Sequence, residues 1–173
     1  MKTVVIYSHS YQTDSVTNRA IVEELARLPH VEVRNLEQLY PDGQIDVAAE
    51  QAALLAADTV VFHHPIFWFN MPPLLKRWMD EVLQYGFAYG STGDKLKGKN
   101  LLHSFTLGSP DQMKTPEFME MLIAPVRMAA GFCSMNYAGE VCTFGQSAQT
   151  NPNRKEDGLN HAQRVAEALA KLG

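Results

Sequence analysis

The sequence is poor in cysteine and in basic stretches, and it has no long apolar run. Two cysteines, Cys133 and Cys142, in 173 residues do not form a disulfide framework, and no C-x-x-C motif or Cys/His cluster is present to bind zinc. No apolar run approaches the ~20 residues that a membrane helix needs. A net charge of −4 without a basic stripe argues against nucleic acid as a partner. We expect a cytoplasmic protein.

Several sequence motifs that would assign a function are also missing. There is no G-x-G-x-x-G dinucleotide fingerprint and no G-x-S-x-G elbow of a hydrolase. The stretch Gly93–Asn100 nearly matches a P-loop. However, Asn100 stands where the magnesium-binding Ser or Thr belongs, and the stretch precedes a predicted strand instead of following one. We interpret it as a surface loop. The segment Met1–Ser8 is too short and too β-branched for a signal peptide, so we expect it to begin the first strand.

What the sequence does contain is a regular alternation of strands and helices. With 46% hydrophobic and 20% charged residues, residues 1–173 suit one globular domain. Predicted strands cover Val4–Tyr7, Val31–Leu36, Thr59–His63, Asn100–Leu107 and Met135–Thr143. Predicted helices cover Ala20–Leu28, Asp46–Ala57, Pro72–Gly86, Pro116–Ala130 and Asn160–Leu172. Five such units predict an α/β, flavodoxin-like three-layer sandwich, whose five-stranded parallel sheet has the order 2-1-3-4-5.

An unusual aromatic loop follows the third predicted strand. Ile66, Phe67, Trp68, Phe69 and Met71 stand between Pro65 and Pro72, where a surface loop is normally small and polar. A stiff apolar loop of this kind is suited to lie against a flat ring, and our hypothesis is a flavin. The alternatives are a buried core segment or an exposed dimer patch.

Two polar loops are expected at the same edge of the sheet, near the switch point between strands 1 and 3. After the first strand, Ser15, Thr17, Asn18 and His9 offer hydrogen-bond donors at a helix N-terminus, which favours an anion. No Lys or Arg precedes Arg19 there, so a monophosphate would be held mainly by hydrogen bonds. The alternative is that these residues only cap the helix. After the fourth strand, Thr106–Ser109 could offer N–H groups to a ring carbonyl, or could be an ordinary turn.

The remaining reactive side chains have weaker signals. His63 and His64 should point to opposite faces of their strand, so a shared metal site is not expected. His103 and His161 look incidental. Cys133 is interpreted as a small core residue because no basic neighbour is evident.

Several motifs together resemble a known family. They are Tyr40–Asp46, Glu50–Leu54, His64-Pro65, Pro72–Lys76, Trp78–Asp80 and Gly86–Gly90. As a set they are similar to the bacterial NAD(P)H:quinone oxidoreductases of the flavodoxin-like fold, and most of all to the ancillary proteins of glutathione-gated potassium efflux systems. The resemblance runs to about Tyr137. It implies FMN as cofactor, with FAD less favoured, NAD(P)H as co-substrate, and a homodimer.

The resemblance also implies roles for individual residues. His9 and Ser15, Val16, Thr17 and Asn18 would hold the phosphate. Pro65, Ile66, Phe67, Trp68 and Phe69 would line the flavin ring, partly through backbone N–H groups, with Trp68 at the substrate face. Thr106, Leu107, Gly108 and Ser109 would close the other side. Many relatives have Thr-Thr-Gly-Gly at this last position, and the Tyr/His relay of mammalian quinone reductases is missing, so no catalytic acid or base is assigned.

The function expected from this resemblance is two-electron, ping-pong hydride transfer from NAD(P)H through the flavin to a quinone or similar flat acceptor. The helix with Trp78 and its exit, Phe87–Tyr89, is expected to form the dimer surface. The alternative function is that of a regulatory subunit of a potassium efflux transporter, held at the inner membrane only through that partner. A one-electron flavodoxin carrier is disfavoured because such carriers are more acidic than −4.

Overall fold

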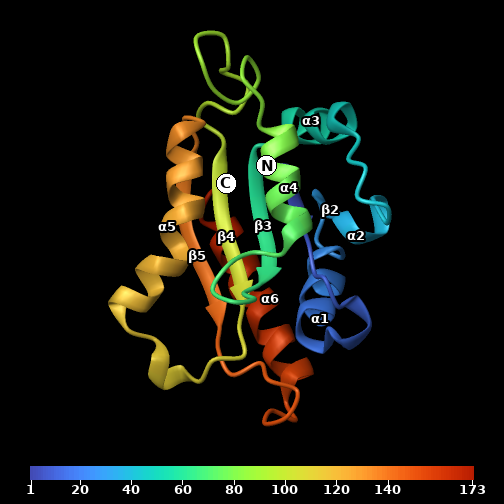
Figure 1. The fold of residues 1–173 in the computed structure, drawn as a ribbon, viewed down its shortest axis with the longest axis vertical. Coiled ribbons are helices and arrows are strands. Elements are labelled where there is room, and N and C mark those ends of the chain that lie inside the picture. The colour runs from blue at the N-terminus through green and yellow to red at the C-terminus, as the bar shows by residue number, and fades with distance from the viewer.

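Five parallel strands form the central sheet of the computed structural model, which describes residues 1–173 (Figure 1). They are β1 (Thr3–Tyr7), β2 (Val31–Asn35), β3 (Thr59–Pro65), β4 (Asn100–Thr106) and β5 (Asn136–Thr143), in the order β2-β1-β3-β4-β5. Strands β1 and β3 are buried along their whole length, as expected for continuous apolar runs covered on both faces. The predicted flavodoxin-like fold and strand order are confirmed.

Helices cover both faces of this sheet. The helices are α1 (Val16–Leu25), α2 (Leu36–Leu39), α3 (Val47–Ala56), α4 (Pro73–Val82), α5 (Pro116–Phe132) and α6 (Arg154–Ala170), with short 3-10 turns at Gln12–Asp14 and Asp111–Met113. One core cluster joins the sheet to α1 and α6, and another joins its opposite face to α3, α4 and α5. None of these helices is both long enough and apolar enough for a bilayer crossing.

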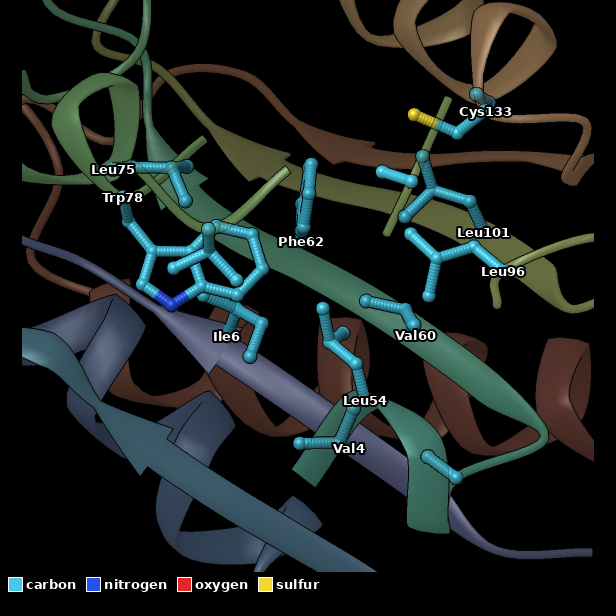
Figure 2. Packing of buried hydrophobic residues seen from close by; sticks show 14 of the residues in the cluster. Val4, Ile6, Leu54, Val60, Phe62, Leu75, Trp78, Leu96, Leu101 and Cys133 are labelled. Atoms are coloured by element: carbon cyan, nitrogen blue, oxygen red, sulfur yellow. The ribbon is translucent and has the colours of Figure 1, made fainter. Parts of the chain in front are cut away.

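Trp78 lies at the centre of the larger core. Figure 2 shows its indole beside Ile6, Leu75 and Phe62, and its side chain is fully buried. The Phe62 and Trp78 rings meet edge to face at 5.7 Å. The expectation that Trp78 belongs to a dimer surface is therefore wrong, because the helical period places it on the buried face of α4 with Leu75 and Val82.

The Trp78 indole also reaches a buried acid. Its Nε1 donates to Glu50 Oε2 at 2.8 Å, and Glu50 has no exposed surface. The other carboxylate oxygen accepts from Arg34 Nε at 2.9 Å and Nη2 at 2.6 Å, and from the Tyr40 hydroxyl at 2.5 Å. This network joins β2, α3 and α4, and every donor that a buried carboxylate needs is supplied.

Several element boundaries differ from those expected: α1 spans Val16–Leu25 instead of Ala20–Leu28, and α4 ends at Val82 instead of Gly86. Strand β2 ends at Asn35, whose side chain accepts from the Gln38 N–H and so caps the short helix α2. Helix α6 begins at Arg154, not at Asn160. Glu156 and Asp157 lie in its first turn, where acidic residues complement the helix dipole, so this polar stretch is a helix start and not a loop.

Candidate functional site

A cavity of about 350 Å³ opens at the carboxyl ends of β1, β3 and β4. Every site residue expected from the sequence lines it except Trp68, Phe69 and Ser109. These lining residues are His9, Ser15, Val16, Thr17, Asn18, Pro65, Ile66, Phe67, Thr106, Leu107 and Gly108. Sequence reasoning missed six others, namely Tyr11, Asp14, Gln146, Ala148, Gln149 and Arg154. The three loops thus meet at one place, as the strand order requires.

The N-terminus of α1 presents free backbone donors to this cavity. Ser15 occupies the N-cap position, yet no side chain accepts from the first N–H groups of the helix. The N–H groups of Val16, Thr17 and Asn18 therefore remain available, and the positive end of the helix dipole adds to them. The polar side chains here do not act as the caps that were considered as an alternative.

Those polar side chains are held by partners across the cavity. The Thr17 hydroxyl donates to Gln146 Oε1 at 2.7 Å, and the Thr106 hydroxyl donates to Asn18 Oδ1 at 2.9 Å. Because Oδ1 is engaged, the Asn18 amide turns its Nδ2 donors the other way. The end of the cavity near α1 is rich in donors, which is the chemistry an anion requires.

His9 adds a neutral donor. The Tyr11 N–H donates to His9 Nδ1 at 3.1 Å, so the hydrogen of the neutral ring lies on Nε2. Burial lowers the pKa of His9 to about 4, and the ring is uncharged at neutral pH. Glu37 fixes this loop from behind: one of its oxygens accepts from the Ser8 hydroxyl at 2.6 Å and from the His9 N–H at 3.0 Å.

The aromatic loop forms a tight hairpin turn. Phe67 and Asn70 exchange backbone hydrogen bonds of 2.9 and 3.0 Å. Between them Trp68 and Phe69 have positive φ angles of 47° and 66°, a turn conformation that normally selects Asn-Gly. The N–H groups of Ile66 and Phe67 are used within the backbone, so in this loop only those of Trp68 and Phe69 remain free for a ligand.

The turn separates the aromatic rings into two groups. Phe67 lines the cavity and lies edge-on to His9 at 5.5 Å and to Tyr11 at 5.6 Å. Trp68 projects outward with 93% of its surface exposed, and Phe69 meets Phe118 of α5 at 6.2 Å. Within this structure only the first half of the loop forms a cavity wall.

The strain in this turn predicts the effect of a substitution. Phe69→Gly should raise the free energy of unfolding by about 0.5–1 kcal/mol, because a non-glycine residue at positive φ costs roughly 1–3 kcal/mol and only a half-exposed ring contact is lost. Urea unfolding measures the change. Asn70→Gly is the control, because Asn70 has no positive φ and should only lose stability. Equal destabilisation by both substitutions would contradict the assignment of strain.

The wall after β4 consists of Thr106, Leu107 and Gly108, and the Leu107 side chain is buried in the core. The Leu107 N–H donates to Thr143 O at 3.0 Å, so it is not available to a ligand. Ser109 lies outside the cavity lining, and its carbonyl accepts from the Gly145 N–H at 2.8 Å. Gly108 lines the cavity, and an added Cβ there would meet nothing closer than 3.9 Å.

The segment after β5 supplies the basic residue that the α1 loop lacks. Arg154, the first residue of α6, lines the cavity and has no carboxylate within ion-pair distance. The expectation of a site without a cation was drawn from the first loop alone. The signal that could have found Arg154 is topological: residues following β5 reach the same carboxyl edge of the sheet as the other three loops.

Four buried histidines lie beneath this edge, three in the sheet on β3 and β4 and the fourth, His161, on α6. His63 Nδ1 and His161 Nε2 each lie 2.8 Å from Ser104 Oγ, and His161 Nδ1 lies 2.8 Å from Thr143 Oγ1. On the other face of the sheet, His64 Nε2 is 3.0 Å from His103 Nε2. His63 and His64 thus face opposite sides, as predicted, and no group of residues suited to bind a metal is found. His103 and His161 are not incidental, since both are fully buried and hydrogen-bonded.

A donor-rich pocket next to an aromatic wall, at the switch point of a 2-1-3-4-5 parallel sheet, defines a flavodoxin-like protein. The model of the family described as "Flavodoxin-like fold" matches residues 1–169, and the chain belongs to this family. It is 43% identical over 148 residues to the glutathione-regulated potassium-efflux system ancillary protein KefF of Klebsiella aerogenes, which spans 82% of this chain and 83% of that protein. The resemblance noted from the motifs is confirmed.

Solved structures give the same result. General stress protein 14 of Treponema denticola, determined in complex with FMN, matches with a TM-score of 0.86 and 31% identity, covering 98% of this chain and 99% of that chain. An NADPH-quinone reductase from P. pentosaceus matches with a TM-score of 0.81 and 24% identity, covering 96% of this chain and 98% of that one. The second likeness concerns the fold alone.

Proposed function

We propose that the protein binds FMN and catalyses hydride transfer from NAD(P)H to a quinone or a similar flat acceptor. The observation that carries the proposal is one cavity with an anion-suited end at α1 and an aromatic wall at Phe67. A family relative determined with FMN supports the choice of cofactor. The expected ping-pong order, in which the two substrates use the site in turn, is part of the proposal.

The donor set of this chain suits a flavin monophosphate. Free N–H groups at the start of α1, His9 Nε2–H and the unpaired Arg154 supply hydrogen bonds and one positive charge for a phosphate. Ile66 and Phe67 supply apolar surface for a flat ring. When bound, the flavin supplies the hydride chemistry.

The protein's own groups bind and orient, and none of them is assigned as an acid or base. His9 is held as a neutral donor at neutral pH, so it can bond a phosphate without titrating near pH 7. Phe67, fixed by His9 and Tyr11, keeps water from one wall of the cavity. Specificity would then depend on the shape of the open side, which suits varied flat acceptors.

The assembly that we propose is a homodimer. Its interface is better placed on α5 than on α4, because Trp78 is buried whereas Met121, Met128 and Phe132 form an exposed apolar stripe on α5.

A relative 43% identical is an ancillary protein of a potassium efflux system, which favours a second role: a cytoplasmic subunit that binds such a transporter. Co-purification with the transporter would support that role, and its absence would count against it.

The direct test is an absorption spectrum of the purified protein, followed by FMN titration and anaerobic addition of NADPH and NADH. We expect bound or bindable FMN that is bleached by at least one nicotinamide and reoxidised by a quinone. Protein that binds no FMN and shows no NAD(P)H oxidation after FMN is added would refute the proposal.

Arg154 allows a sharper prediction about the phosphate. Arg154→Gln should weaken FMN binding roughly 10- to 100-fold, because a charge-assisted hydrogen bond contributes about 1.5–3 kcal/mol. Riboflavin, which lacks the phosphate, should bind the variant and the unsubstituted protein alike. Fluorescence titration measures both ligands. Lys155→Gln, which removes an exposed positive charge one residue away, is the matched control and should change neither affinity appreciably.

A further inference from the structure

The segment after β5 is closed into a compact loop by one carboxylate oxygen. Asp157 Oδ2 accepts from Gln146 Nε2 at 2.9 Å and from Asn151 Nδ2 at 2.8 Å. These two residues mark the start and the end of the loop, and the Asn151 N–H also bonds back to Ser147 O at 3.0 Å. A single acceptor therefore joins both ends of the loop to the first turn of α6.

The same loop touches the anion-suited end of the cavity. Gln146 Nε2 donates to Asp157 Oδ2 and to the Phe144 carbonyl, and these two acceptors set the orientation of the amide so that its Oε1 accepts from the Thr17 hydroxyl. Gln146, Ala148 and Gln149 all line the cavity, and Arg154 does so from the adjoining helix start. Asp157 does not line it.

The contact between α6 and α1 at this point leaves little room for adjustment. A Cβ placed on Gly158 would lie 2.7 Å from Thr17 O and 3.0 Å from the Ala20 Cβ. The residue after Asp157 is thus packed directly against the start of α1. This close packing fixes the distance between Asp157 and the Thr17 backbone, and the Gln146 side chain spans it.

We propose that Asp157 is a positioning residue for the phosphate of the bound flavin. It acts through Gln146, which holds the Thr17 side chain away from the free N–H groups of α1, and through Asn151, which keeps the loop folded beside Arg154. The proposal rests on the proposed function, since it concerns how that site binds FMN.

The negative charge of Asp157 and its proposed positioning role predict opposite effects on the affinity for FMN. As a negative charge near a phosphate, Asp157 should weaken FMN binding, and its removal should strengthen binding. As a positioning residue it should strengthen binding, and removal of its acceptor oxygen should weaken it. Both hydrogen bonds end on one oxygen, so the amide oxygen of Asp157→Asn can keep them while the charge is lost.

The experiment measures the affinities of FMN and riboflavin for Asp157→Ala, Asp157→Asn and Glu156→Ala. Glu156→Ala removes an exposed acid from the same helix turn and makes no side-chain hydrogen bond in this structure, so it controls for charge. We expect Asp157→Ala to bind FMN about tenfold more weakly with riboflavin affinity unchanged, and Asp157→Asn to restore most of the loss. A double-mutant cycle with Gln146→Leu should show strong non-additivity, because both residues act through one chain of contacts.

Three outcomes would overturn the proposal. The first is stronger FMN binding by both Asp157 variants, which would assign a charge effect only. The second is an equal loss for FMN and riboflavin, which would assign a general structural role. The third is an unchanged FMN affinity in Asp157→Ala. If the unsubstituted protein binds no FMN at all, the proposed function itself fails, and that result is distinct from these three.

Discussion

Replacing Glu50 with alanine is expected to lower the free energy of unfolding by about 3–5 kcal/mol, because it leaves Arg34 without its buried partner. The carboxylate receives four donated hydrogen bonds, from Arg34, Tyr40 and Trp78. Removing it also leaves the Trp78 N–H without an acceptor in the core, and an orphaned buried donor is itself costly. Burial together with the hydrogen bond to Glu50 raises the pKa of the Tyr40 hydroxyl to about 12, so Tyr40 stays a donor over the whole working range of pH.

Glu32 provides the matched control for this prediction. It pairs with the same Arg34 at 2.8 Å, but its side chain is 56% exposed. Glu32→Ala should cost less than about 1 kcal/mol, the range for exposed ion pairs. Urea unfolding of both variants measures the difference. If the two variants lose the same amount of stability, the buried network does not stabilise the fold in the way we infer.

The Glu50 network also shows where sequence reasoning about the fold reaches its limit. Strand order followed from the alternation of apolar runs and helical periods, because these patterns depend on which faces are buried. Nothing local to Glu50 indicates burial, and a glutamate on a helix is normally exposed. Its partners come from 10, 16 and 28 residues away along the chain, so only the tertiary fold reveals the network. The misplacement of Trp78 on a surface has another origin, because the helical period already groups it with Leu75 and Val82 on the apolar face of its helix, and that face is the buried one.

The candidate site was also predictable from the sequence only in part. The loops after β1, β3 and β4 were recognisable because each has an unusual composition. The loop after β5 has an ordinary polar composition, and it contributes Gln146, Gln149 and Arg154 only because α6 packs against α1 at Gly158. The strained turn at Trp68 and Phe69 was also not predictable, since aromatic residues rarely adopt positive φ. It directs Trp68 outward, with 93% of its surface exposed.

The four histidines buried in the sheet and on α6 predict a steep loss of stability in mild acid. Burial lowers the pKa of His64 to about 4 and that of His161, which also lies near Arg164, to about 3; the pKa values of His63 and His103 lie well below their ordinary value. In the unfolded chain all four titrate near 6.5. As the pH falls from about 6.5 toward 4, the unfolded chain therefore binds protons that the folded protein does not. This proton binding stabilises the unfolded state relative to the folded one.

Each such histidine should lower the free energy of unfolding by about 1.4 kcal/mol per pH unit within that window, so four together approach ~5.5 kcal/mol per unit. A domain with a total stability of about 5–15 kcal/mol should then unfold near pH 5 or soon below it. The hydrogen bonds explain why the rings stay neutral. His64 Nδ1 donates to the Pro65 carbonyl, its Nε2 accepts from His103, and His103 Nδ1 is left without a partner, so an added proton there would have no acceptor.

Urea unfolding between pH 8 and 5 measures this dependence, and the slope counts the protons taken up on unfolding. His103→Leu should reduce the slope by about 1.4 kcal/mol per pH unit, because one titrating group is lost. His30→Ala, which removes an exposed histidine, is the control for substitution of a histidine as such. A stability that is flat from pH 6.5 to 5, or a His103→Leu slope equal to that of the unsubstituted protein, would show that these rings already carry protons in the folded state.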